Sequence, residues 1–251
     1  MLLPGTVLCL ALLAGLPGCP GESALNEIAS RPGNSGFRNQ LLGEERLVSL
    51  EQGNLSEDTP NDAAGRIDVL DAFLRKYAME FGVLPANSGA LSLISAAPEQ
   101  KALFNENEVH QTLIFHQEHL GALVLDAEIY GEFVGHDADG NRLRRVQGRL
   151  FDPLTLTTPV PGSSLNVALA NRQFLQFLAE NGLEGGSVSI LPTPVILGDK
   201  NFTGFLSLYT VPNDDGTLDR LSVVVNPLTE EIEVNYSIPA CRAHDALGDA
   251  S

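Results

Sequence analysis

Histidines and carboxylates near the middle of the chain are the first residues whose types could support catalysis. A zinc peptidase of the His-Glu-x-x-His type needs two imidazoles on one helix face and a glutamate that activates water. The nearest string in this chain, residues 116–119, reads His-Gln-Glu-His and has a different spacing. On an extended strand His110 and His116 would lie roughly 20 Å apart, too far to share a metal. We therefore interpret them as polar strand positions that face solvent, and we expect no metal site.

Other catalytic signatures are also missing from the sequence. Ser88-Gly89 and Gly162-Ser163 lack the Gly-x-Ser-x-Gly elbow of serine hydrolases, and no Walker or dinucleotide motif occurs. Residues 136–141, HDADGN, alternate acidic side chains as a calcium loop does, but the glycine comes two positions early. The Asp-Gly pair favours a hairpin turn instead, because glycine reaches positive φ at low cost. We predict a protein that is not an enzyme and needs no cofactor.

Four arginines within eight residues form the densest basic group in the chain, namely Arg142, Arg144, Arg145 and Arg149. One interpretation pairs them across strands with Asp126, Glu128 and Glu132, each pair contributing a few tenths of a kcal/mol. The alternative is a basic surface for an acidic partner. We favour the pairing and keep Arg142, Arg144 and Arg145 as candidate partner contacts.

The strands around these residues follow from hydrophobic periodicity. From Ala122 to Val134 the apolar and polar side chains alternate, which is typical of a half-buried strand in an antiparallel sheet. An earlier strand is expected over 109–117 with a turn near Gly121, and a returning strand over 142–150. These segments predict a tight hairpin entered through the earlier strand.

Two amphipathic helices are expected, each followed by strands. Residues 67–81 place large apolar side chains on one face at a spacing of 3.6, and residues 165–181 repeat the pattern. A strand is expected at 90–96, and four more strand-like runs follow the second helix, at 187–197, 203–211, 218–226 and 231–238. The predicted fold class is α+β, with two small modules that each pack an amphipathic helix on an antiparallel sheet.

Composition limits the classes of partner. The chain has 251 residues, 43% of them apolar, which is enough for a folded body with a sizeable core. Its formal net charge of -17 repels nucleic acid and anionic membrane surfaces, so neither is expected as a direct partner. Such acidity favours a basic partner or simply keeps the protein soluble.

The N-terminus reads as an export signal. Residues 1–19 hold an apolar run too short to span a bilayer, and Leu16 to Cys19 resembles a bacterial lipobox, whose cysteine becomes lipidated. Pro17 and the lack of Lys or Arg before the apolar run depart from that pattern. We expect an exported protein, lipid-anchored through Cys19 to the bacterial envelope at the outer membrane or cell surface; the alternative is plain secretion. Residues 20–66 are polar and are predicted to be a flexible tether.

A stretch of about forty residues, 113–153, resembles the fungalysin/thermolysin propeptide (FTP) motif. The motif is an aromatic-x-Gln, a glycine, a short apolar run, an Asp-x-x-Gly turn and a closing x-x-Gly strand. The matching residues are Phe115 and Gln117, Gly121, Leu123 to Leu125, Asp137 to Gly140, and Val146 to Gly148. On this resemblance, residues 67–156 form an FTP-like module.

The second half resembles the PepSY domain, which follows the FTP motif in thermolysin-type precursors. The closing pattern there is apolar-apolar-Val-Asp-Ala-x-Thr-Gly-Glu-Ile, and residues 223–232 read VVVNPLTEEI. Asn226, Pro227 and Glu230 replace Asp, Ala and Gly, so different turn chemistry is expected. The division is then a linker at 157–164, a PepSY-like module at 165–240 and a tail at 241–251.

The two resemblances imply a function without chemistry of its own. In the family such modules fold against a zinc peptidase, assist its folding and block its cleft, but no peptidase follows them in this chain. We expect a non-catalytic, propeptide-like binding protein that inhibits or chaperones a secreted zinc metalloprotease in trans. The alternative is a structural or surface-assembly lipoprotein that has kept the propeptide fold without a protease partner.

Cys241 would be the one thiol outside the leader, beside Arg242 and near His244. A cationic neighbour favours the thiolate, and thiolates bind zinc. In a protease precursor this is the position where the prosegment meets the enzyme, so one hypothesis is that Cys241 caps a partner's zinc. An incidental thiol or an intermolecular disulfide is the simpler interpretation.

Overall fold

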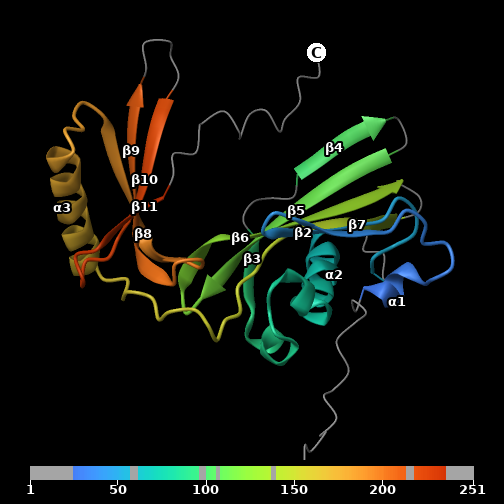
Figure 1. The fold of residues 1–251 in the computed structure, drawn as a ribbon. Coiled ribbons are helices and arrows are strands. Elements are labelled where there is room, and N and C mark those ends of the chain that lie inside the picture. The colour runs from blue at the N-terminus through green and yellow to red at the C-terminus, as the bar shows by residue number, and fades with distance from the viewer. Residues whose placement is uncertain are drawn as a thin grey trace, which may run out of the picture.

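A computed structural model describes residues 25–56, 62–95, 100–105, 108–136, 140–212 and 218–235. Within them, one continuous sheet of eleven strands forms the body of the protein (Figure 1). The prediction of two modules, each with its own sheet, is therefore wrong. In this part of the chain no helix is long and apolar enough to cross a membrane. Cys19, Cys241 and the turn residues 137–139 lie outside the described residues.

Helices and strands follow one another along the chain in a mixed order. They are α1 (Asn26–Ala29), β1 (Arg38–Leu42), β2 (Glu45–Ser49), α2 (Ala63–Lys76), η1 (Ala78–Phe81), η2 (Pro85–Ala90), β3 (Ser92–Ser95), β4 (Gln100–Asn105), β5 (Glu108–His119), β6 (Ala122–His136), β7 (Gly140–Gly148), α3 (Ser164–Glu180), β8 (Ser187–Leu197), β9 (Phe202–Pro212), β10 (Leu218–Val225) and β11 (Ile232–Asn235).

Strand β6 joins the two parts of the sheet. It pairs antiparallel with β5 along one side from Ala122 on, and its later residues pair antiparallel with β7 on the other side. Its first residues, Leu123–Leu125, pair in parallel with Val195–Leu197 of β8. Strands β9, β10 and β11 then extend the sheet as an antiparallel meander. A parallel pair needs a long crossover, and in this fold that crossover contains α3. This single pairing is what makes one sheet out of two.

Helix α2 covers the first part of the sheet. Its N-cap Asp62 accepts a hydrogen bond from the Gly65 N–H at 2.7 Å, which satisfies one of the free donors at the helix start. Leu70 and Leu74 are buried in a core that includes Ile129 of β6. These apolar contacts fix which face of β6 points at the helix.

Helix α3 covers the second part of the sheet and lies well apart from α2 in Figure 1. Its N-cap Ser163 accepts a hydrogen bond from the Asn166 N–H at 3.2 Å. Phe174 is fully buried in a core with Phe205 of β9 and Val223 of β10. Apolar periodicity in the sequence therefore located both helices, although it did not show that they share one sheet.

The segment expected to be a flexible tether differs from that prediction wherever it is described. β1 and β2 form a hairpin that joins the sheet through β7, and Val48 of β2 is fully buried. Leu25 and Ile28 also lie in the core, so α1 is packed against the body. The polar composition concealed this structure because a few apolar residues are enough to bury one hairpin face.

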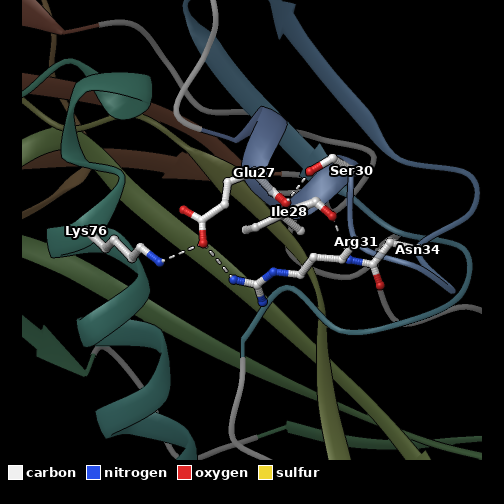
Figure 2. A network of polar contacts seen from close by, with 6 residues as sticks. All are labelled: Glu27, Ile28, Ser30, Arg31, Asn34 and Lys76. Atoms are coloured by element: carbon white, nitrogen blue, oxygen red, sulfur yellow. Dashed lines mark hydrogen bonds and ion pairs between the residues drawn. The ribbon is translucent and has the colours of Figure 1, made fainter.

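One ion pair, between Glu27 and Lys76, links α1 to the end of α2. Figure 2 shows the Glu27 carboxylate between the Arg31 guanidinium, at 3.0 Å, and the Lys76 ammonium, at 3.7 Å. The hydrogen bond from Arg31 and the charge of Lys76 lower the pKa of Glu27. Asn34 also donates to the Ile28 carbonyl at 2.8 Å. Such exposed pairs add little stability, so the burial of Leu25 and Ile28 is what chiefly holds α1 in place.

Candidate partner-binding face

The face of the sheet turned away from α2 carries ionisable side chains. On β6, Ile129 and Phe133 point into the core and Gly131 lies directly beneath Leu70 of α2, so the alternate residues point the other way. We call this set the charged face; it consists of His110, His116, Glu128, Tyr130, Glu132 and Arg145. The register of β5, β6 and β7 places these residues side by side.

Glu132 is held between His110 and Arg145. His110 Nδ1 lies 2.6 Å from one carboxylate oxygen of Glu132, and Arg145 Nη1 lies 3.4 Å from the other. The side chains of His110 and Glu132 are 18% and 22% exposed, so this pair is partly shielded from water. The expected pairing of an arginine with Glu132 is thus present for Arg145.

Glu128 is held in a similar way further along the strand. His116 Nδ1 lies 3.3 Å from Glu128, and the Tyr130 hydroxyl donates to Glu128 at 2.6 Å. Burial, together with the hydrogen bond to Glu128, raises the pKa of Tyr130. His110 and His116 share a strand face, as the spacing predicted, but each contacts a glutamate instead of simply facing water.

The remaining arginines have separate positions. Arg144 donates to the carbonyls of Leu50 and Gly53 at 3.1 and 2.8 Å, so it anchors the N-terminal segment. Arg142 lies exposed near the start of β7. The four arginines therefore form no common basic stripe.

Arg149 lies where the two parts of the sheet meet. Its guanidinium contacts Glu44 in the β1–β2 turn and Asp199 in the β8–β9 turn, and it stacks 4.3 Å above the Phe151 ring. Burial lowers the pKa of Arg149. One side chain thus connects three segments that are distant in the sequence.

A cavity of about 530 Å³ is lined by Arg149 and, through Glu128, adjoins the charged face. Its lining includes five carboxylates, from Glu44, Glu45, Asp126, Glu128 and Asp199. Burial, and then the nearby Glu128, raise the pKa of Asp126. Among the described residues, no group of three or more histidine, cysteine or acidic side chains is arranged to hold a metal ion. The five carboxylates make the surroundings of the charged face negative.

Sequence reasoning missed the tie between β5 and the segment after β7. The fully buried Gln117 donates through Nε2 to the Phe151 carbonyl at 2.7 Å and accepts from the Phe151 N–H at 2.8 Å. Its side chain therefore pairs with backbone as a neighbouring strand would. The available signal was an amide at an inward-pointing position, two residues after the buried Phe115.

Asp152 makes a second tie in the same segment. Its buried carboxylate accepts from the Leu84 N–H at 3.1 Å, from Asn87 Nδ2 at 2.8 Å and from the Leu154 N–H at 3.0 Å. Burial alone would raise the pKa of Asp152, but the hydrogen bonds from Asn87 and the two backbone groups outweigh it and lower the pKa. The chain leaving the charged face is thus fixed to the body.

Glycines of the propeptide-like motif occupy positions that the fold restricts. Gly121 forms the β5–β6 turn at a φ of 82°. Gly148 ends β7 at a φ of 141°, and a Cβ there would lie 1.9 Å from the Glu128 carbonyl oxygen. A side chain at Gly148 would push the end of β7 away from β6.

The turn between β10 and β11 forms despite its altered residues. The Asn226 side chain accepts from the Leu228 and Thr229 N–H groups at 3.0 and 3.3 Å. Glu230 takes the left-handed conformation, with a φ of 63°, at the position where the PepSY pattern has glycine. Asn226 supplies the acceptor that an aspartate would, so the hairpin survives.

Comparisons with known proteins place the chain in no family. No family model matches it, and no curated protein sequence matches it at a significant level.

Proposed function

We propose that this is a non-catalytic, propeptide-like binding protein that inhibits or assists the folding of a secreted zinc metalloprotease in trans. The observation that carries the proposal is the β5–β6–β7 ribbon, backed by α2, which presents the charged face on its opposite side. Motif residues at 115, 117, 121, 146 and 148 occupy buried or restricted backbone positions of this ribbon. The motif and the ribbon thus support the proposal together.

The charged face can discriminate between partners by charge. Glu132 already contacts His110 and Arg145, so a partner must match an existing pattern instead of meeting isolated charges. The neighbouring cavity carries five carboxylates against one guanidinium, and the whole chain has a net charge of -17. Electrostatic attraction would therefore steer a basic surface of the partner toward this face.

The alternative of a surface-assembly protein drew on the altered turn at 226–230. Asn226 caps that turn, and Glu230 adopts the backbone conformation of the glycine it replaces. The altered residues are thus compatible with the hairpin and do not favour the alternative. We keep the lipid anchor at Cys19 as part of the proposal, with an envelope location at the outer membrane or cell surface.

The test uses thermolysin-type peptidases refolded without their own prosegments. Addition of the protein is expected to raise the yield of active enzyme or to inhibit the native enzyme saturably, measured with a fluorogenic peptide. Glu132→Arg should weaken the effect, because it removes a carboxylate from the charged face and places a second guanidinium beside Arg145. Glu180→Lys, a charge reversal at the exposed end of α3, is the control and should behave as the unmodified protein.

Two results would contradict the proposal. One is a panel of such peptidases in which neither the refolding yield nor the activity changes. The other is an effect that Glu132→Arg and Glu180→Lys alter equally, which would place the contact away from the charged face. Circular dichroism of both variants confirms that they fold.

A further inference from the structure

We propose that the groove between α3 and the first half of β8 binds an extended, uncharged segment of another polypeptide as an added β-strand. Strand β9 pairs along one side of β8, with residues 187–190 and again with residues 194–197. On the other side, β6 pairs only with Val195–Leu197. Within the described chain, residues 187–193 of β8 therefore have no strand beside them on that side.

The open edge offers backbone hydrogen-bonding groups. In an antiparallel pair, alternate residues direct their N–H and C=O groups to the partner strand, and the residues between direct theirs away. Residues 187–190 follow regular register with β9, so half of them point their backbone groups to the open side. Pro192 has no N–H and sets the end of the usable edge. The edge thus spans about five residues, or roughly 17 Å.

A groove runs along this edge and would hold the side chains of an added strand. It has a volume of about 530 Å³, and α3 contributes Val167, Ala168 and Asn171 to its lining. From β8 come Val188 and Ile190, of which Val188 is 38% exposed. A helix beside an open strand edge is the arrangement through which PDZ and PTB domains bind extended peptides. Backbone bonds would supply affinity and the groove would select side chains.

The charge of the groove decides the chemistry of the occupant. No residue that lines it is ionisable, although the chain as a whole carries a net charge of -17. A charged side chain facing the groove would lose hydration without gaining a partner, whereas small apolar side chains would replace water at Val188 and Ile190. The neutral groove therefore matches a strand whose groove-facing residues are uncharged and β-branched.

The test uses a capped, uncharged heptapeptide, Ser-Thr-Val-Thr-Val-Thr-Ser, titrated into the full chain and followed by amide NMR. Saturable binding is expected with a Kd below about 1 mM. Alternate amides within residues 187–191 should exchange at least about tenfold more slowly when the peptide is bound, because strand addition gives them acceptors. A peptide with proline in place of both valines loses two backbone N–H donors for the β8 carbonyls and should not bind.

Variants on α3 test the groove itself. Ala168→Arg fills it from an exposed helix position and should weaken binding at least about tenfold. Ala179→Arg makes the same change at an exposed position of α3 that is not part of the groove lining, and should leave binding unchanged. Both variants should retain the thermal unfolding midpoint of the parent.

Three outcomes would overturn the inference. The first is no saturable binding, or binding without slower exchange at 187–191. The second is edge amides that are already protected in the peptide-free monomer, which would mean that another segment of this chain covers the edge. The third is protection that appears only as the protein dimerises, measured by sedimentation. None of these concerns the charged face, so this inference and the proposed function fail separately.

Discussion

Replacing Gln117 with leucine tests whether its side chain holds the segment after β7 to the sheet. Leucine has a similar size but cannot bond, so the N–H and C=O of Phe151 both lose their partner. An unsatisfied buried polar group costs about 1–3 kcal/mol, and two such groups give about 2–6 kcal/mol. Phe151 is only partly buried, so water can compensate in part and we expect a loss of about 2–4 kcal/mol.

The assay is urea unfolding, with stability taken from the midpoint and the slope m. The Gln117→Leu midpoint should fall while m stays constant, because the surface exposed on unfolding is nearly unchanged. Gln147→Leu makes the same chemical change at a more exposed site, where the amide donates to Glu45 at 2.8 Å. This control should lose no more than about 1 kcal/mol.

A glutamate at position 117 gives a second, pH-dependent test. When ionised it can still accept from the Phe151 N–H but repels the Phe151 carbonyl, and burial raises its pKa above that of the unfolded chain. A raised folded-state pKa means that the stabilising form is present at low pH and is lost as pH rises through that pKa. The difference in free energy of unfolding between Gln117→Glu and the parent should therefore become smaller as the pH is lowered. A Gln117→Leu loss equal to the Gln147→Leu control would refute the reasoning.

Three further substitutions test the packing and the turns. Gly131→Ala should cost about 1–3 kcal/mol in urea unfolding, because its Cβ would lie 2.4 Å from a leucine methyl of α2. At Gly89 an added Cβ would meet nothing within 4 Å, so Gly89→Ala should change the free energy of unfolding by less than about 0.5 kcal/mol. An equal loss in the two alanine variants would contradict the close approach of Gly131 to Leu70. Glu230→Gly should stabilise by up to about 1 kcal/mol by relieving a φ of 63°, and a lower thermal midpoint would count against it. Asp152→Ala should cost about 2–3 kcal/mol at pH 7. Because the folded-state pKa of Asp152 is lowered, this stabilisation is present above the ordinary aspartate pKa and disappears as pH falls through the lowered value. The free energies of unfolding of parent and variant should therefore converge in acid.

Local periodicity predicted most of the elements but not their bounds in full. The predicted helix at 67–81 corresponds to α2 followed by the short η1, and the strand predicted over Ala122 to Val134 lies within β6. From Ala127 on, alternation along β6 also assigned its two faces, since Ile129 is buried and Glu128 is only partly buried. Before that point the prediction was wrong, because Asp126 has a φ of 64° and Val124 is buried in place of Leu123 and Leu125. These features depend on residues close together in the chain, which is why the sequence carries them.

The contacts that define the candidate site come from separate segments. Arg149 was grouped with its sequence neighbours, but its partners Glu44 and Asp199 come from turns about a hundred and fifty residues apart and so gave no local signal. The tie from Gln117 to Phe151 spans 34 residues. Side-chain pairing across such distances becomes visible only when the strands are in register.

The sequence by itself determined the two amphipathic helices, the alternating strands, the acidity and the lack of a zinc-peptidase motif. Only the tertiary structure decided that one sheet runs through the whole body, because the parallel contact between β6 and β8 joins residues about seventy positions apart. It also decided that a polar N-terminal segment adds a hairpin to that sheet. The physical reason is that hydrophobic period specifies which face of an element is buried, whereas the choice of neighbouring strand depends on backbone edges that look alike in sequence.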